Sequence, residues 1–276
     1  MNNAEILSPE ALLHYSNVDE ESRLTKGAGQ LELLRSLEII RRYLPKPPAK
    51  IIDIGGGCGI YACLLAKQGY TVTLIDAVPL HIEKAKKASQ LQPDLPIKEI
   101  ALGDACNLPY QADTFDAALL LGPLYHLTKR NDRLQAIREV RRVLKNDCYL
   151  FAAVISRFAS MLDGYFRKLI LDPVFQEIMI NDLKDGQHRN PTNHPAYFTT
   201  TYFHHPSELK TEIEEAGLKH EVTNAIEGMA WLLPNFEEYW QDQEQREVLL
   251  NTIRTIESED TIIGISAHIM AVGRKE

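Results

Sequence analysis

The chain has 276 residues, 45% of them hydrophobic and 25% charged, which suffices for one large domain, or a domain with an insertion, around a buried core. The formal net charge of −8 argues against a long nucleic-acid interface, because such an interface requires a basic face. No apolar run approaches the ~20 residues that cross a bilayer, and the start MNNAEILSPE is too polar for a signal peptide, so we expect a cytoplasmic protein without membrane contact.

The N-terminal region is expected to form helices beside the main domain. Ser8 and Pro9 are typical of a helix start, and a second helix is predicted over residues 30–43, where leucine and isoleucine follow one stripe. Nothing here has catalytic spacing. Tyr15 and residues 23–29 are nevertheless candidates for lining a ligand pocket.

Residues 50–68, KIIDIGGGCGIYACLLAKQ, predict a strand, a glycine turn and a helix. The strand is an apolar, β-branched run of the kind that is buried on both faces. The four glycines can take backbone angles closed to other residues and let a ligand lie against the main chain. Asp53 stands just before them, where a carboxylate would repel a diphosphate and accept a cationic ligand. The looser spacing Gly57-x-Gly59-x-x-Ala62 also fits a dinucleotide fingerprint, so this turn alone leaves both ligands open.

Acidic residues also end the next two predicted strands. Residues 71–76 (TVTLID) predict a buried strand that ends in Asp76, where a carboxylate can accept both hydroxyls of a ribose; a plain cap of the following helix is the alternative. Residues 97–103 predict a weaker third strand that leads to Asp104. Residues 115–122 (FDAALLLG) predict a fourth strand.

The spacing Asp53-x-Gly55-x-Gly57-x-Gly59, together with these later acids, resembles the class I S-adenosylmethionine-dependent methyltransferases. The resemblance implies an α/β fold, a Rossmann-like doubly wound sheet of seven strands with an antiparallel last strand. It also implies S-adenosylmethionine as methyl donor and S-adenosylhomocysteine as product, with Asp76 on the ribose and Asp104 on the adenine amino group. The cofactor-binding residues predicted in this way are Asp53, Gly55, Gly56, Gly57, Gly59, Asp76, Ala77, Asp104, Ala105 and Leu121.

The fourth strand leads into residues 122–127 (GPLYHL), a stretch that in the family lies beside the sulfonium methyl group. Tyr125 and His126 are therefore candidate catalytic residues that position the acceptor or remove its proton, and His205 is a third candidate. Packing of His126 between core elements is the alternative. Enzymes that methylate the exocyclic amine of a nucleobase carry an Asn/Asp-Pro-Pro-aromatic tetrad here. The GPLY of this chain lacks that tetrad, which argues against base methylation by that route.

The regular alternation of strands and helices breaks after the fifth predicted strand, residues 148–155. About fifty residues with apolar groups at helical spacing follow, and we expect a helical insertion that acts as a lid. Its last part, residues 187–205, is rich in histidine and aromatic residues and suggests a pocket wall. We predict no metal site, because this run lacks acids and regular spacing and the four cysteines show no metal-like pairing. His204 and His205 could instead cap the next helix.

The remaining chain predicts a helix over residues 206–216, a strand over 219–226, a helix over 236–257 and a final strand over 266–274. The predicted divisions are N-terminal helices flanking the cofactor site (1–49), an S-adenosylmethionine-binding core (50–155), the helical lid or substrate insertion (156–205) and the C-terminal part of the sheet (206–276).

The runs GPLYHL and YFHHPSEL resemble a bacterial group of stand-alone, small-molecule methyltransferases, similar to methyltransferase types 11 and 25. The leading hypothesis is methyl transfer to a small-molecule acceptor by in-line displacement at the sulfonium methyl group. The alternatives are a methyltransferase acting on RNA or protein, a dinucleotide-binding oxidoreductase, or a non-catalytic nucleoside sensor. We expect a monomer or homodimer without a nucleic-acid partner, and the sequence leaves the acceptor open.

Overall fold

The computed structural model describes residue 10, residues 20–192 and residues 194–276. The predicted helix start at Ser8 and Pro9, and the pocket candidate Tyr15, lie outside the described residues. No helix in the described ranges combines the length and apolar character needed to span a membrane.

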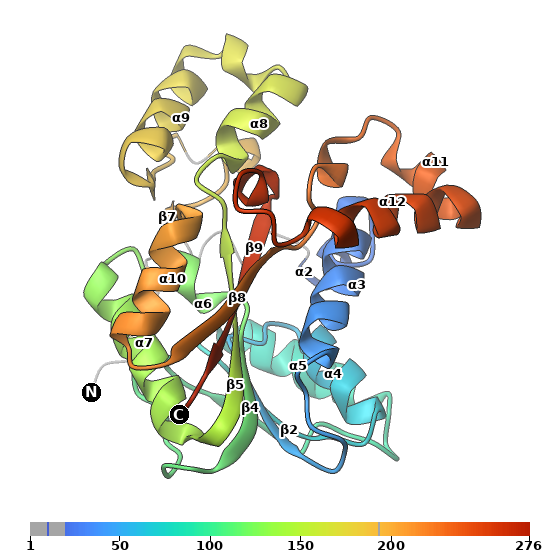
Figure 1. Cartoon of the computed structure of the whole chain (residues 1–276), viewed down its shortest axis with the longest axis vertical. Coiled ribbons are helices and arrows are strands. Elements are labelled where there is room, and N and C mark those ends of the chain that lie inside the picture. Colours follow the sequence, from blue (N-terminus) through green and yellow to red (C-terminus); the bar gives the residue numbers. More distant parts are fainter. Residues whose placement is uncertain (1–9, 11–19, 193) are drawn as a thin grey trace.

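Seven strands form one sheet in the spatial order β3-β2-β1-β4-β5-β9-β8 (Figure 1). The strands are β1 (Lys50–Ile54), β2 (Thr71–Asp76), β3 (Glu99–Leu102), β4 (Phe115–Leu120), β5 (Leu144–Ile155), β8 (Lys219–Ala225) and β9 (His268–Arg274). The pairs between β3 and β5 are parallel, whereas β9 runs antiparallel to both β5 and β8. This confirms the predicted seven-stranded sheet with an antiparallel last strand.

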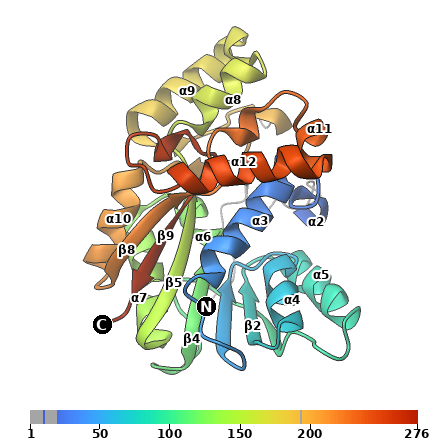
Figure 2. The same cartoon turned by 45° about the vertical axis from the view of Figure 1, so that its right-hand side comes forward.

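Helices cover both faces of the sheet (Figure 2). One layer contains α3 (Ala28–Arg41), α4 (Ile60–Lys67) and α5 (Pro79–Gln90), and the other contains α7 (Arg130–Val143) and α10 (Pro206–Glu215). The strands supply side chains to both layers in alternation. In β4, Ala117 and Leu119 pack with the first layer, and Ala118 and Leu120 pack with the second. Burial on both faces explains why residues 117–120 of β4 are apolar without interruption.

The insertion after β5 contains two helices that project beyond the carboxyl ends of the parallel strands (Figure 1). They are α8 (Ala159–Phe166) and α9 (Pro173–Asp185), joined by the 3₁₀ helix η1 (Leu169–Leu171). A two-stranded ribbon of β6 (Gln187–His188) and β7 (Thr201–Tyr202), with η2 (Pro195–Tyr197) between them, returns the chain to α10. The short helices α2 (Glu20–Arg23) and α6 (Pro123–His126) lie near the carboxyl ends of the strands.

The prediction of a single helix over residues 236–257 is wrong, because the helix is interrupted. The structure has two helices, α11 (Phe236–Gln241) and α12 (Gln243–Ile256), which follow η3 (Ala230–Leu232) and precede η4 (Ile263–Ile265). Asp242 between them is extended, and its Oδ1 accepts the N–H of Gln245 at 2.9 Å. An aspartate in this conformation caps a new helix, so it ends the first one.

A buried ion pair joins the helices of the second layer. Arg133 on α7 donates to both carboxylate oxygens of Glu212 on α10, and the two side chains are 2% and 1% exposed. Arg133 also donates to the carbonyl oxygens of Leu127 and Thr128, at 3.0 and 3.1 Å. This guanidinium therefore holds the loop after α6 against α7 and α10.

We expect Arg133→Met to lower the free energy of unfolding by about 3–5 kcal/mol, because it leaves Glu212 as a buried carboxylate without its main partner. Arg130→Met is the matched control. Arg130 pairs with Glu215 at 2.8 Å on the surface, and such pairs contribute about 1 kcal/mol or less. Urea denaturation of both variants measures the difference, and equal losses would contradict the role given to Arg133.

Candidate active site

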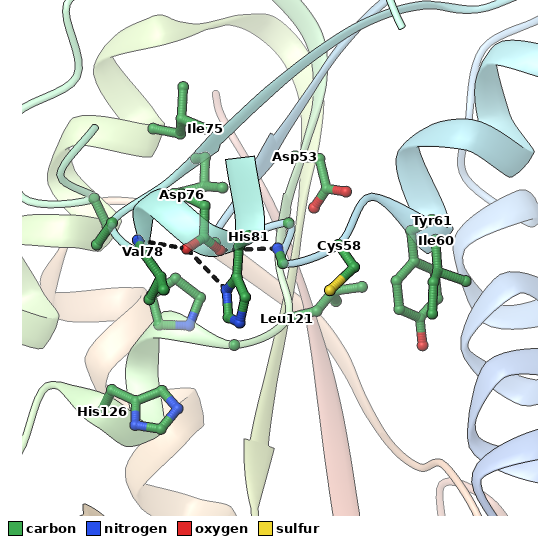
Figure 3. A pocket seen from close by; sticks show the side chains of 18 of the residues that line it. Asp53, Cys58, Ile60, Tyr61, Ile75, Asp76, Val78, His81, Leu121 and His126 are labelled. Carbon is green, nitrogen blue, oxygen red and sulfur yellow. Dashed lines mark hydrogen bonds and ion pairs between the residues drawn. The ribbon is translucent and has the colours of Figure 1, made fainter. Parts of the chain in front are cut away.

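A cavity opens at the carboxyl ends of the parallel strands, between the glycine turn after β1 and the segments that follow β2, β3 and β4 (Figure 3). It brings together most of the predicted site residues, namely Asp53, Gly55, Gly56, Gly57, Asp76, Ala77, Asp104, Ala105, Leu121, Tyr125 and His126. Arg23 and Leu24, from the predicted pocket segment 23–29, line it as well. Two predicted site residues, Gly59 and His205, do not line this cavity.

The glycine turn is shaped for close approach. Gly55 and Gly57 have φ angles of 68° and 54°, which favour glycine. A Cβ atom on Gly56 would lie 2.8 Å from the Leu74 side chain and 2.9 Å from Cγ of Asp53, so this position also excludes a side chain. Gly59 serves packing instead: it precedes α4, and a Cβ atom there would lie 3.2 Å from Cβ of Ala85 on α5. The turn therefore forms a main-chain cradle at the cavity.

Asp53 is the most unusual titratable group in the cavity. Its side chain is buried, with the residue 1% exposed, and its Oδ2 has no hydrogen-bond partner within the described residues. Burial and, secondarily, the charge of Asp76 raise the pKa of Asp53 to about 7. The backbone N–H of Ala62 reaches this carboxyl group, but a buried carboxylate oxygen without a partner is still costly unless a cation or donor reaches it. This group suits a cationic ligand.

The carboxylate of Asp76, at the end of β2, is held by three donors. Its Oδ2 accepts the N–H of Gly57 at 2.8 Å, and its Oδ1 accepts the N–H of Val78 at 2.8 Å. The Nδ1 atom of His81 lies 3.1 Å from the same Oδ1 (Figure 3). Sequence reasoning missed His81, although it lies in the first turn of the helix that Pro79 opens. Asp76 lines the cavity in a fixed orientation, as a residue that accepts ligand hydroxyls requires.

Asp104 follows β3 and belongs to the same cavity. Its Oδ1 accepts the N–H of Cys106 at 2.8 Å, which fixes the turn after the strand. Burial, followed by the charges of Asp104 and Asp132, raises the pKa of Cys106 to about 12, so this thiol is neutral. All four cysteines are free in the structure.

Tyr125 and His126 lie on α6, directly after β4, and both line the cavity. Their ring centroids are 4.6 Å apart. His205 lies elsewhere: it is the N-cap of α10, and its Nδ1 accepts the N–H of Ser207 at 3.4 Å. It borders a second hollow beside Phe158. The helix-capping alternative for His205 therefore describes its position better than a place in the cavity.

The insertion contributes none of the described residues that line the cavity. Its histidines have partners of their own: His188 lies 2.8 Å from Asp182, and the fully buried His204 lies 3.3 Å from Glu212. A closing movement of the insertion stays a prediction.

Two further residues that line the cavity, Glu32 on α3 and Tyr61 on α4, were not predicted as site residues from the sequence.

Comparison with known proteins identifies a domain in the central part of the chain. Residues 52–152 match the family model described as a methyltransferase domain. The demethylmenaquinone methyltransferase of Corynebacterium kroppenstedtii is 28% identical over 147 residues, which cover 51% of this chain and 58% of that protein. The mitochondrial ubiquinone biosynthesis O-methyltransferase of Schizosaccharomyces pombe is 34% identical over 121 residues, 44% of each chain. The chain thus spans 58% or less of the length of these two relatives.

The fold agrees with this match over a larger part of the chain. A crystal structure of an S-adenosylmethionine-dependent methyltransferase from Methanosarcina mazei superposes with a TM-score of 0.58 and 20% identity, covering 86% of this chain and 96% of that one. At this identity the likeness shows the fold alone. The matched domain, the strand order and the antiparallel last strand agree: residues 52–152 match a methyltransferase domain, and they lie in a sheet with the fold of S-adenosylmethionine-dependent methyltransferases.

Proposed function

We propose that this chain transfers the methyl group of S-adenosylmethionine to a small-molecule acceptor. The observation that carries the proposal is the buried, unpartnered Oδ2 of Asp53 beside a glycine cradle. The amino acid end of S-adenosylmethionine bears an ammonium group that would complete the hydrogen bonding of this oxygen. A dinucleotide would instead bring a diphosphate toward Asp53, which the carboxylate disfavours.

The other carboxylates fit the nucleoside half of the same donor. Asp76 is oriented at the end of β2, where a ribose would lie in a doubly wound sheet. Asp104, with Gly103 and Ala105 beside it, lines the cavity after β3 and would face the adenine. These assignments extend the proposed donor site to individual residues.

The character of the acceptor is inferred from the cavity wall and from the relatives. Leu24, Leu121, Pro123 and Leu127 give an apolar wall, and Tyr125 and His126 supply polar groups. Of the two relatives described above, one is named for demethylmenaquinone and the other for ubiquinone biosynthesis, so a hydroxylated ring is the first acceptor to test. The net charge of −8 gives no support to RNA as the acceptor.

In the proposed mechanism the bound donor supplies a methyl group that is already electrophilic. The glycine cradle and the three aspartates would hold that group at the carboxyl end of β4. The apolar wall would exclude water and align the acceptor, and orientation of this kind can contribute about 7–11 kcal/mol. A hydroxyl acceptor must also lose a proton, and His126 is the titratable group best placed to accept it.

Isothermal titration tests the donor site directly. We expect the protein to bind S-adenosylmethionine and S-adenosylhomocysteine but not NADH, and we expect Asp76→Ala to weaken both by about 10–100-fold, because hydrogen bonds to a charged group are lost. Asp94→Ala, at an exposed position, is the control and should change nothing. Binding of NADH alone would overturn the methyltransferase function, and normal binding by Asp76→Ala would overturn the role of Asp76.

The raised pKa of Asp53 makes donor binding depend on pH. Below pH about 7 this carboxyl group is protonated in the free protein, and an arriving ammonium group must displace the proton. Affinity for S-adenosylhomocysteine should therefore rise by up to about tenfold per pH unit from pH 5.5 to 7 and then level off.

Titration in buffers of different ionisation enthalpy should show proton release on binding below pH 7. Asp53→Asn keeps the shape of the side chain and should remove both the slope and the proton release. A slope that survives in Asp53→Asn would assign the pH dependence to another group.

Substitutions of two histidines, one inside the cavity and one outside it, form a matched pair of variants that tests the proposed general base. His126→Gln should lower kcat for a hydroxyl acceptor by about 10²-fold or more, since general bases contribute about 10²–10⁴-fold, and should leave donor affinity unchanged. His205→Gln should leave kcat unchanged, because His205 caps α10 outside the cavity. Transfer of a labelled methyl group measures both, and an unchanged kcat in His126→Gln would exclude this histidine as the base.

A further inference from the structure

The short helix α6 carries Tyr125 and His126, the two cavity residues that supply polar groups for the acceptor in the proposed function. The helix has only four residues, and a single turn of this kind is marginal on its own. Its orientation must therefore come from the segments that pack against it. These segments include β5 and, from the insertion, β7.

The ring of Tyr125 packs against an apolar cluster that the insertion largely provides. The buried members of this cluster are Ile155 at the end of β5, Ala159 on α8 and Phe203 directly after β7. Tyr125 is partly buried against them, and it lines the cavity as well. A side chain of the cavity wall thus rests on the insertion, although the described residues of the insertion do not line the cavity themselves.

Phe203 is held in turn by a hydrogen-bonded histidine. The imidazole of His188 on β6 stacks on the Phe203 ring, with the centroids 4.8 Å apart and the planes 12° apart. Its Nδ1 lies 2.8 Å from Oδ2 of Asp182 on α9, and its Nε2 lies 2.6 Å from the carbonyl oxygen of Tyr197. Both nitrogens of this buried imidazole have partners, so the ring cannot turn without losing a hydrogen bond. The support of Tyr125 therefore extends to α9.

Two polar contacts fix the carboxyl end of α6 from the same ribbon. Nε2 of Gln187 on β6 donates to the carbonyl oxygen of Thr128 at 3.1 Å. Arg133 donates to that carbonyl oxygen and to the one of Leu127, a residue that lines the cavity. The ring of Tyr202 on β7 covers the Arg133 guanidinium, whose central carbon lies 3.8 Å from the ring centroid. Because a desolvated cation is stabilised by an aromatic face, Tyr202 helps to hold the group that holds Leu127.

These contacts distinguish a support from a lid. A lid closes over the bound substrate and contributes groups to the closed site. The described residues of the insertion instead contact residues of the cavity wall without lining the cavity. The contacts reach α6 and the two residues after it, which form the acceptor side of the site.

We propose that the ribbon of β6 and β7 positions α6 for acceptor binding, with Gln187 and Tyr202 as positioning residues. The inference rests on the proposed function, because it takes Tyr125 and His126 as acceptor-side residues. It adds that the insertion sets the acceptor side of the site, whereas the glycine turn and the strand ends set the donor side. Changes in the ribbon should therefore affect acceptor turnover without affecting donor affinity.

A matched pair of glutamines tests the polar contact. Gln187→Ala removes the donor to Thr128. Gln176→Ala removes a similar donor that stays inside the insertion, where Nε2 of Gln176 reaches the carbonyl oxygen of Ile170 at 2.6 Å. In hydrogen exchange followed by mass spectrometry, residues 122–129 should exchange about 3–10-fold faster in Gln187→Ala, because one hydrogen bond is lost. Gln176→Ala should leave the exchange of this segment unchanged.

A second pair tests the aromatic contact. Tyr202→Leu removes the ring over Arg133 and should speed exchange of residues 122–129 by about 10-fold or more, since a desolvated cation loses its aromatic face. Tyr202→Phe keeps the ring and loses only the hydroxyl, which contacts Arg157 and Glu208 at 3.1 Å, so it should restore slow exchange. Thermal melting checks that each variant is folded, and Gln187→Ala decides the test should Tyr202→Leu fail to fold.

Two assays separate the acceptor side from the donor side. In isothermal titration, Gln187→Ala and Tyr202→Leu should bind S-adenosylhomocysteine within about twofold of the unchanged protein, because the donor residues are untouched. Transfer of a labelled methyl group to 1,4-hydroquinone or catechol should show kcat lowered by about 10-fold, since a small displacement of an orienting group is costly. The KM for the donor should stay unchanged, and Tyr202→Phe should recover kcat.

The outcomes separate the inference from the function. If the unchanged protein binds no S-adenosylhomocysteine, the proposed function fails, and exchange still reports whether the ribbon positions α6. If exchange of residues 122–129 is unchanged in Gln187→Ala and Tyr202→Leu, the positioning role is wrong while the function stands. Faster exchange throughout the chain, weaker donor binding or an unchanged kcat would also overturn it. If the unchanged protein binds the donor but methylates neither probe, exchange and donor affinity decide. Faster exchange confined to this segment, with normal donor affinity, supports the proposal.

Discussion

The carboxylate of Asp76 is the contact on which the rest of the site depends. It accepts N–H groups from Gly57 and Val78 and lies against His81, so it ties the turn after β1 to the end of β2 and the start of α5. A buried carboxylate is stable only when its oxygens are satisfied, and here the main chain of the glycine turn satisfies one of them. The shape of the cradle and the orientation of the acid are therefore fixed by the same hydrogen bond.

The sheet and the segments beyond its carboxyl end are held by different forces. The sheet under the cavity consists of parallel strands whose central side chains are mostly apolar on both faces, and hydrophobic burial stabilises it. The loop after α6 and the insertion, whose described residues do not line the cavity, depend on buried arginines. Arg133 holds the loop after α6, while Arg157 donates to the carbonyl oxygen of Phe203 at 2.8 Å and pairs with Glu208 at 2.7 Å, which secures both ends of the insertion. Directional contacts of this kind fix loops that have little core of their own.

Local signals made the sheet and the glycine turn predictable from the sequence. A β-branched apolar run and a glycine cluster specify structure within a few residues, and the strands of the core were predicted within a few positions. The break at Asp242 was missed because a capping aspartate can lie inside an otherwise helical stripe without disturbing its pattern. The histidine-rich segment near residue 205 led to the prediction that His205 is catalytic. The structure instead makes His205 the N-cap of α10, directly before Pro206.

Contacts between distant segments were not predictable in this way. Glu32 and His268 meet only because α3 packs beside the start of β9, and neither residue has a partner at a readable spacing. His81 could have been predicted more easily, since it follows Asp76, an acid that was already identified, by five residues. The candidate site was thus predicted where cavity-lining residues directly follow strand ends, and it was missed where tertiary packing brings side chains from other segments to the cavity.

The place of β9 in the sheet has a consequence for how the chain is made. This strand, formed by the last part of the sequence, lies between β5 and β8 and supplies the pairing partners of both. Until it emerges from the ribosome, β5 presents an open edge and β8 has no place in the sheet. The sheet is therefore completed only after β9 has been synthesised, and the unpaired edge of β5 is exposed to aggregation until then.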